Sequence, residues 1–459
     1  MHYPWWHLPH LTAPMVIAAI ATFHVIISHY AVGGGLFLAV ETSHARKSGD
    51  AAYLAYLRGH ARFFILITMV LGAITGVGIW WTIGLASPLA TEVLIRIFVF
   101  GWAMEYVFFL LEIVSAFLFY YLWDRLTART HVMFAWIYAF SAWMSLVLIT
   151  GITAFMLNSG DWVEEGGFWR AFFNPQFLPQ TAARTGGALL LASMTVYFHA
   201  SIWAPDAALR LKIARRSARP ALLGAVLIAL GTAGWYANLP AHSLVALAKA
   251  PALNIFMALL FAITVAAFAV FFLIPYRHPN WLSPGFGILF LMFGIGAVAM
   301  GEFVREAVRK PFIVDRVVLS NQVLVSEMEA TRRDGLLERG PWTRAWVRGK
   351  YPEVFDGPRI DESRLLALPR PDQIEIGALV FMHACNDCHA IESGLSAMRH
   401  LTQSWPDDRL RSLARSPETF QHIMPPFAGT DEESEMLALW LIANRPEPLA
   451  IDTGLREGN

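Results

Sequence analysis

The order of hydrophobic and polar residues divides the chain near residue 310. Before that point long apolar runs alternate with short polar stretches, and after it charged residues interrupt the apolar ones. A bilayer core of about 30 Å needs roughly 20 consecutive apolar residues in a helix, because each backbone amide must be satisfied within the segment. Eight runs meet that length, at residues 13–41, 63–84, 91–122, 132–157, 182–203, 221–238, 252–275 and 284–308. The pattern predicts an all-α protein, with a polytopic membrane bundle of about eight transmembrane helices over residues 1–312.

Composition agrees with this division. Of the 459 residues 56% are hydrophobic and 15% are charged, and residues 1–300 hold only 26 of the 70 charged side chains. A single water-soluble globule of this length would not need so many apolar residues, so that class is excluded. The formal net charge is zero. The molecule therefore lacks the basic field that gathers nucleic acid, and we expect no nucleic-acid partner.

Lysines and arginines of the short loops predict the orientation. The loops after the first, third, fifth and seventh runs hold twelve of them, and the loops after the second, fourth and sixth hold three. Cytoplasmic loops carry the excess of positive charge, so the odd-numbered loops are expected in the cytoplasm. The first run follows no basic n-region and no small-residue cleavage site, so we expect it to be retained. The prediction is a multi-pass protein of the bacterial inner membrane with both termini on the periplasmic side.

The two cysteines stand in a haem-attachment motif. Residues 385–389 read Cys-Asn-Asp-Cys-His. In such a C-x-x-C-H sequence Cys385 and Cys388 attach haem c through thioethers, and His389 binds the iron. A zinc site would need two further ligands at matching spacing, and a thioredoxin-type pair would need a βαβ frame. We therefore predict one covalent haem c on the periplasmic side.

Residues downstream of the motif offer the second iron ligand. Met424 supplies a thioether before two prolines, and His422 and His383 are its alternatives. Thr430 and Glu433 form a capping box for a last helix that ends near residue 444.

The order of apolar helix, haem motif, Met-Pro-Pro and final helix resembles a small class I cytochrome c over about residues 371–446. We assign residues 371–459 to a small α-helical cytochrome c domain. Residues 313–370, rich in arginine and glutamate, are interpreted as a polar linker or docking segment.

Histidines inside the first apolar run are candidate haem ligands. A charge at the hydrocarbon centre costs at least about 2.5 kcal/mol, so each intramembrane ionisable residue is a functional candidate. His24 and His29 lie five residues apart, about 140° around a helix, and cannot share one haem face. One can bind iron while the other points elsewhere, and a hydrogen bond between helices is the structural alternative for each. The glycines at 33–35 admit a close neighbour, either a helix or a porphyrin edge.

Acidic residues gather on two predicted helices. Glu105 and Glu112 are seven residues apart on one face of the third helix, which suits proton conduction or contact with haem propionates and iron. Near the end of the eighth helix, Glu302, Glu306 and Arg309 share a stripe. A hydrogen-bonded structural carboxyl and a snorkelling membrane edge are the alternatives. We expect the four glutamates to handle protons.

Four places resemble subunit I of the cytochrome bd quinol oxidases, across nearly all of residues 10–312. They are Phe23-His24, Trp123-Asp124-Arg125-Leu126, the segment from Asn254 to Met257, and Glu306-Ala-Val-Arg309-Lys310-Pro311-Phe312. The last is similar to the family's Glu-x-Gly-Arg-Gln-Pro-Trp signature. The resemblance implies that His24 and Glu306 bind the irons of paired haems and that Met257 binds the iron of a further b haem. It also implies that Glu112 is part of the proton path. Apart from the resemblance, His29 and Arg309 are further haem-binding candidates because of their places on the first and eighth helices.

The chain departs from that family in several ways. Residues 180–184 contain no histidine where the family has one, so the second ligand of the Met257 haem is not identified. His199 lies at the other end of that helix, about 24 Å away. The loop in which the family binds quinol is reduced to about residues 238–251, and a cytochrome c domain takes the place of a ninth helix.

These features predict a membrane electron-transfer cytochrome, either a quinol:cytochrome c-type oxidoreductase or the membrane subunit of a respiratory complex. Electrons pass between the quinone pool and a periplasmic cytochrome or redox enzyme through two or more b haems and the haem c. One alternative is a bd-type terminal quinol oxidase that reduces O2 at a His24/Glu306 haem pair. The other is a haem-carrying anchor that docks a larger periplasmic enzyme. In each case we expect a multi-subunit complex in the lipid bilayer.

Overall fold

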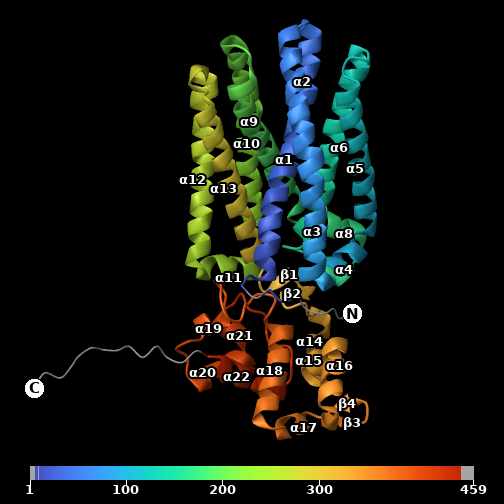
Figure 1. Cartoon of the computed structure of the whole chain (residues 1–459), viewed down its shortest axis with the longest axis vertical. Coiled ribbons are helices and arrows are strands. Elements are labelled where there is room, and N and C mark those ends of the chain that lie inside the picture. Colours follow the sequence, from blue (N-terminus) through green and yellow to red (C-terminus); the bar gives the residue numbers. More distant parts are fainter. Residues whose placement is uncertain (1–5, 9, 446–459) are drawn as a thin grey trace, which may run out of the picture. The chain divides into compact units, whose positions relative to one another are not determined.

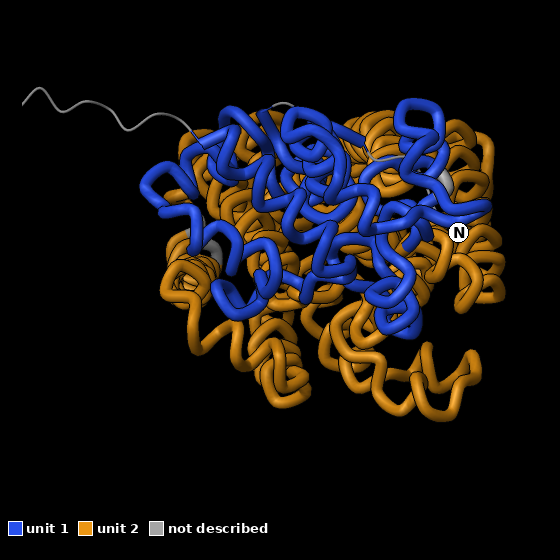
Figure 2. Tube along the Cα trace, turned by 90° about the horizontal axis from the view of Figure 1, so that it is seen from below, with its two compact units in different colours: residues 1–16, 85–89, 318–459 blue, residues 17–84, 90–317 orange. Residues whose placement is uncertain are grey.

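The computed structural model describes residues 6–8 and 10–445 and divides the chain into two compact units. Residues 17–84 and 90–317 form one, here called the membrane unit. Of the described residues, 6–8, 10–16, 85–89 and 318–445 form the other, here called the C-terminal unit (Figure 2).

Long apolar helices run side by side in the membrane unit (Figure 1). Within the described residues eight helical segments are long and apolar enough to cross a membrane, which confirms the predicted polytopic bundle. They are α1 (Ala13–Ser48), α2 (Ala51–Ile65) continued through the π-helical η1 (Leu66–Leu71) into α3 (Gly72–Ala86), α5 (Val99–Tyr121), α6 (Ala128–Phe155), α9 (Phe177–Trp203), α10 (Ala207–Ala237), α12 (Pro251–Phe271) and α13 (Pro284–Arg309).

Several helices extend beyond their apolar runs. α1 continues to Ser48, α2 begins at Ala51 and α10 begins at Ala207. The starts of α2 and α10 are set by caps, because Asp50 accepts the amide of Tyr53 and Asp206 that of Leu209. Hydropathy identifies only the part of a helix that lies within the bilayer, whereas capping determines the residue at which the helix begins.

Shorter elements connect the long helices. The run predicted over 91–122 is interrupted at Phe98, which separates α4 (Pro88–Ile97) from α5. The others are α7 (Trp162–Glu165), α8 (Phe168–Phe172), α11 (Ala241–Lys249), η2 (Phe272–Arg277), η3 (Pro279–Trp281) and β1 (Phe312–Val314). α11 occupies the shortened segment between the sixth and seventh long helices.

α9 is the central helix of the membrane unit. In its most apolar window 72% of residues are buried, against 11–33% in the other spans. Small residues bring its neighbours close: a Cβ on Gly33 of α1 would lie 2.1 Å from the carbonyl oxygen of Ala188, and one on Gly186 would lie 2.4 Å from that of Gly224 in α10. Of the two close neighbours predicted for the glycines at 33–35, a helix or a porphyrin edge, the structure shows neighbouring helices.

The C-terminal unit is also helical. It contains η4 (Val325–Glu327), α14 (Met328–Asp334), α15 (Leu336–Arg339), α16 (Pro341–Lys350), η5 (Pro352–Val354), α17 (Glu362–Ala367), α18 (Arg370–Ala384), α19 (Met398–Leu401), α20 (Asp407–Arg415), α21 (Pro417–Phe420) and α22 (Asp431–Asn444), with the short strands β2 (Val318–Leu319), β3 (Phe355–Asp356) and β4 (Arg359–Ile360). The stretch from residue 318 to 370, interpreted from sequence as a linker or docking segment, is folded into this unit.

The core of the C-terminal unit is the crossing of α18 and α22. Gly377 touches the backbone of α22, since a Cβ there would lie 2.0 Å from the carbonyl oxygen of Met436. One turn on, the rings of Phe381 and Trp440 are 4.3 Å apart. The capping box of Thr430 and Glu433 starts α22 as predicted.

Candidate redox sites

The haem motif forms one tight turn at the end of α18. The amide of Cys385 donates to Phe381, and the amides of Cys388 and His389 both donate to the carbonyl of Cys385, at 3.1 and 2.9 Å. Neither cysteine is in a disulfide, and burial raises the pKa of Cys385 to about 12. Cys385, Cys388 and His389 therefore lie on one turn of the backbone, and covalent haem attachment needs these three side chains close together.

One nitrogen of His389 is already engaged. Its Nδ1 donates to the carbonyl of Ser396 at 3.1 Å, which leaves Nε2 available as an iron ligand. Burial lowers the pKa of His389, so the imidazole stays neutral. A neutral imidazole is the form that binds iron.

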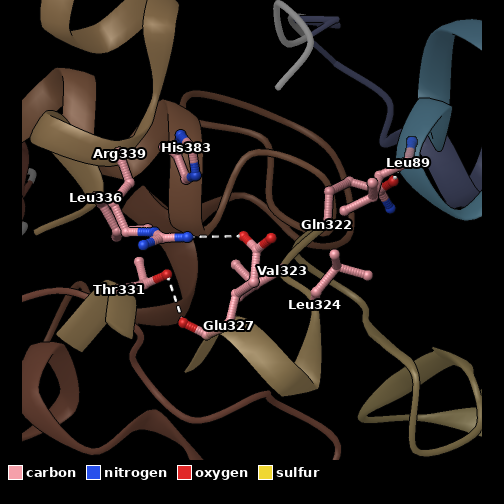
Figure 3. Close-up of a pocket in the computed structure, with 9 residues that line it drawn as sticks. All are labelled: Leu89, Gln322, Val323, Leu324, Glu327, Thr331, Leu336, Arg339 and His383. Carbon is pink, nitrogen blue, oxygen red and sulfur yellow. Dashed lines mark hydrogen bonds and ion pairs between the residues drawn. The ribbon is translucent and has the colours of Figure 1, made fainter. Parts of the chain in front are cut away.

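The three distal candidates lie in different surroundings. Met424 is half-buried on the turn before α22, and Nε2 of His422 is buried without a hydrogen-bond partner among the described residues. His383 instead lines a small pocket beside Arg339, whose guanidinium pairs with Glu327 at 3.1 Å (Figure 3). Met424 and His422 thus follow the haem motif on one segment, and the donor set of thiols, neutral imidazole and thioether or imidazole fits a haem c.

His24 and His29 face different helices, as their spacing predicts. Nδ1 of His24 lies 3.1 Å from the hydroxyl of Thr75 in α3, beside Gly76. Nδ1 of His29 bonds the carbonyl of Val25 at 2.8 Å, and its ring faces Gly187 of α9. Both rings keep Nε2 as the nitrogen that a haem iron would use.

Glu105 and Glu112 lie on one face of α5. Both carboxyl groups face Ser145 of α6 and lie near each other. The phenol of Tyr138, also on α6, lies close enough to Glu112 to interact with it electrostatically. The structure thus brings the two predicted acids together with hydroxyl groups.

The acids of α13 are held by cations. Glu302 pairs with Arg305 at 2.8 Å, and the guanidinium of Arg184 and the imidazole of His29 are near enough to interact with it electrostatically. Glu306 pairs with Arg309 and, at 3.2 Å, with Lys310.

Met257 packs in an apolar cluster. The cluster contains Leu247 of α11, Leu253 of α12 and Val304 and Val308 of α13, together with Leu157 and Leu239 from the segments that follow α6 and α10.

A group of buried imidazoles and phenols was missed by the sequence analysis. His60 of α2 and His199 of α9 are 0% and 4% exposed, and their rings are 4.6 Å apart. Tyr30 and Tyr56 each bond one of them. The available signal was the spacing of Tyr53, Tyr56 and His60, which places all three on one face of a helix.

Comparison with known proteins shows the family to which the chain belongs. The family model of cytochrome bd terminal oxidase subunit I matches residues 13–250, more than half of the chain. This chain belongs to that family. A solved structure of bd oxidase from Geobacillus thermodenitrificans is similar to this bd-family chain with a TM-score of 0.57 and 17% identity, covering 66% of this chain and 87% of that one. At that identity the likeness establishes the fold alone. No curated protein is similar enough in sequence to count as a relative.

The matched residues of the bd-family chain contain some candidates and not others. His24, Glu105 and Glu112 lie within 13–250, whereas Met257, Glu306 and the whole haem motif lie beyond it. Among the described residues no group of three His, Cys, Asp or Glu side chains is placed to hold a bare metal ion. Axial ligation of a porphyrin needs only one or two such groups.

Proposed function

We propose that this bd-family protein is the haem-carrying subunit of a quinol oxidase that delivers electrons to O2. The observation that carries the proposal is the family match over the helices that hold His24, Glu105 and Glu112. It supports the oxidase alternative better than electron exchange with a periplasmic partner. When bound, b-type haems supply the one-electron chemistry and the site of O2 reduction.

The residues of the membrane unit have distinct tasks in this proposal. Thr75 lies against Nδ1 of His24, so Nε2 is the nitrogen that would hold a haem iron. Glu105 and Glu112 hold protons beside Ser145. Arg309 balances the charge of Glu306. The carboxylate of Glu306 would hold a haem iron only after its ion pair with Arg309 or Lys310 opens.

The loop charges give the direction of this chemistry. The ends of α1, α5 and α9 face the cytoplasm, and both termini face the periplasm. Protons that reduce O2 then come from the end of the bundle where α1 ends and α2 begins.

A second function is favoured by the geometry of His389. The cytochrome c domain, residues 371–459, carries one covalent haem c that exchanges electrons with a periplasmic cytochrome or redox enzyme. Its support is the Nε2 of His389, which the bond from Nδ1 to Ser396 leaves for an iron, on the same turn as two cysteines that form no disulfide. Residues 313–370 serve as the docking surface for that partner.

One preparation tests both functions. The purified chain should show b and c haems in a pyridine haemochrome spectrum and consume O2 with a soluble quinol, with inhibition by cyanide. The variant C385A/C388A should lose only the c haem. Quinol oxidation that requires an added acceptor and consumes no O2 would replace the oxidase with the electron-exchange interpretation. Absence of b haem would overturn both the oxidase and that interpretation, and absence of c haem from the wild type would overturn the second function.

A further inference from the structure

Proton-carrying side chains form a nearly continuous buried series in the membrane unit that contains none of the predicted haem ligands. They are Glu41 and Tyr30 on α1, Tyr53, Tyr56 and His60 on α2, and His199 on α9, none more than 5% exposed. Buried polar groups are costly unless they bond one another. Six of them in one apolar bundle call for an explanation.

The series begins at a charged end of the bundle. The hydroxyl of Tyr53 donates to the carboxylate of Glu41 at 2.8 Å, and Arg216 of α10 pairs with the same carboxylate. Next to it Lys212 pairs with Asp50, the cap of α2. Water and protons are available at such an end.

Two imidazoles form the middle. The rings of Tyr53 and Tyr56 stack with centroids 6.3 Å apart, and the hydroxyl of Tyr56 lies 3.0 Å from Nδ1 of His199. The ring of His199 stands edge-on to that of His60, with 4.6 Å between centroids. Nε2 of His60 then lies 3.2 Å from the hydroxyl of Tyr30.

One ring nitrogen of this group makes no hydrogen bond to the described residues. Nδ1 of His60 is buried and has no hydrogen-bond partner among the described residues. Leaving that nitrogen unsatisfied costs stability. His131 has the same unpaired nitrogen, but its ring neighbours are Phe119 and Trp123, whereas His60 lies beside a second imidazole, that of His199. A histidine that takes a proton on one nitrogen and releases one from the other uses both.

The series ends near the acids of α5. Tyr30 and Phe64 are in ring contact at 5.4 Å, as are Phe64 and Tyr138. The phenols of Tyr30 and Tyr138 interact electrostatically, and so do Tyr138 and Glu112. The hydroxyl of Tyr138 donates to the carbonyl of Ala31 at 3.3 Å, and its phenol interacts electrostatically with the carboxyl of Glu112 that the proposed oxidase uses.

We propose that these side chains conduct protons from Glu41 to Glu112 by way of His199 and His60. At each hop an oxygen or nitrogen accepts one proton and releases another, so no other covalent bond changes and no electron is transferred. Hydrogen bonds join Glu41 to Tyr53, Tyr56 to His199 and His60 to Tyr30. The steps between these pairs, from His199 to His60 among them, and the last steps through Tyr138 to Glu112 need a side-chain rotation or a bridging water. The role rests on the proposed function, because O2 reduction consumes protons.

The test measures proton access to Glu112 without using turnover. The full chain in nanodiscs at pH 5 is moved into D2O, and infrared spectroscopy follows the carboxyl band that Glu112→Gln removes. His199→Gln keeps a bond to Tyr56 but passes no proton, and Tyr56→Phe removes the hydroxyl. Both should slow deuteration at least tenfold, and free imidazole should restore the rate in His199→Gly.

The matched control variants replace a buried histidine and a buried tyrosine that lie outside the series. His131 is 0% exposed and bonds the carbonyl of Phe119, and Tyr197 is 0% exposed and bonds that of Ala214. His131→Gln and Tyr197→Phe should exchange like the wild type. Equal exchange rates in all four variants would overturn the route.

Quinol-driven O2 uptake separates the two proposals. Slow exchange in the His199 and Tyr56 variants of a protein without oxidase activity would retain the route and remove the oxidase. An active wild type whose His199→Gln variant keeps full turnover and fast exchange would retain the oxidase and remove the route. Retained b-haem absorbance in each variant shows that the bundle is folded.

Discussion

At the scale of single residues, a hydrogen bond to one ring nitrogen decides which nitrogen of a histidine remains for chemistry. Ser396 fixes Nδ1 of His389, and Thr75 lies against Nδ1 of His24. Both rings thus keep the nitrogen at the tip. His131 is the reverse case, since its Nε2 bonds a carbonyl.

The assignment of His24 predicts a selective loss. His24→Ala should remove one b haem, about half of the b-type absorbance if the membrane unit holds two, and leave haem c unchanged. A haemochrome spectrum measures both. His278→Ala, on an exposed histidine, is the control. Unchanged b-haem content in His24→Ala would show that this ligand is wrongly assigned.

The choice between Met424 and His422 predicts a change in potential. A thioether ligand raises the reduction potential of a haem relative to an imidazole. If Met424 is the distal ligand, Met424→Ala should lower the potential of haem c and open the iron to carbon monoxide. His422→Ala should do neither. A redox titration that gives the opposite pattern would assign the ligand to His422.

At the scale of elements, close backbone contacts hold the bundle. A Cβ on Gly186 would meet the backbone oxygen of Gly224, which cannot move aside as a side chain can. Gly186→Ala should therefore destabilise the bundle by about 1–3 kcal/mol. Thermal unfolding in detergent measures this. Gly84→Ala is the control because nothing lies within 4 Å of its Cβ, and equal melting of the two variants would refute the packing argument.

Glu433 joins two elements of the C-terminal unit. Its buried carboxyl accepts the amides of Leu336 and Leu337 at 2.8 and 2.7 Å and that of Thr430 at 3.1 Å. Glu433→Gln weakens three bonds and should cost about 1–3 kcal/mol. Urea unfolding of the full chain checks this, with the exposed Glu329→Gln as control. A loss no larger than that of the control would contradict it.

The sequence predicted elements better than contacts. Hydropathy located all eight spans, since the bilayer sets their length, and Thr430 with Glu433 located the start of α22. The pairing of His60 with His199 was not predictable, because 139 positions separate them and their contact depends on how α2 meets α9. The cations on Glu306 were in the sequence, but spacing alone did not show that they engage its carboxylate.

At the scale of the whole molecule, two compact units predict two unfolding transitions with different dependence on pH. Burial, and then the carboxyl of Glu432, raise the pKa of Glu362 to about 8. The folded C-terminal unit thus holds a proton that the unfolded chain releases near its ordinary value. Stability from this group is fully present at low pH and is lost as pH rises towards 8.

The window above pH 6.5 isolates this effect. Burial lowers the pKa of His389, so its contribution to stability increases with pH only up to its ordinary value near 6.5. Between pH 6.5 and 8.5 the C-terminal transition should therefore move to lower temperature, while haem b absorbance follows a separate transition. Glu362→Gln should flatten the slope because its amide cannot ionise. A wild-type slope of zero, or an equal slope in the variant, would contradict the shared proton of Glu362 and Glu432.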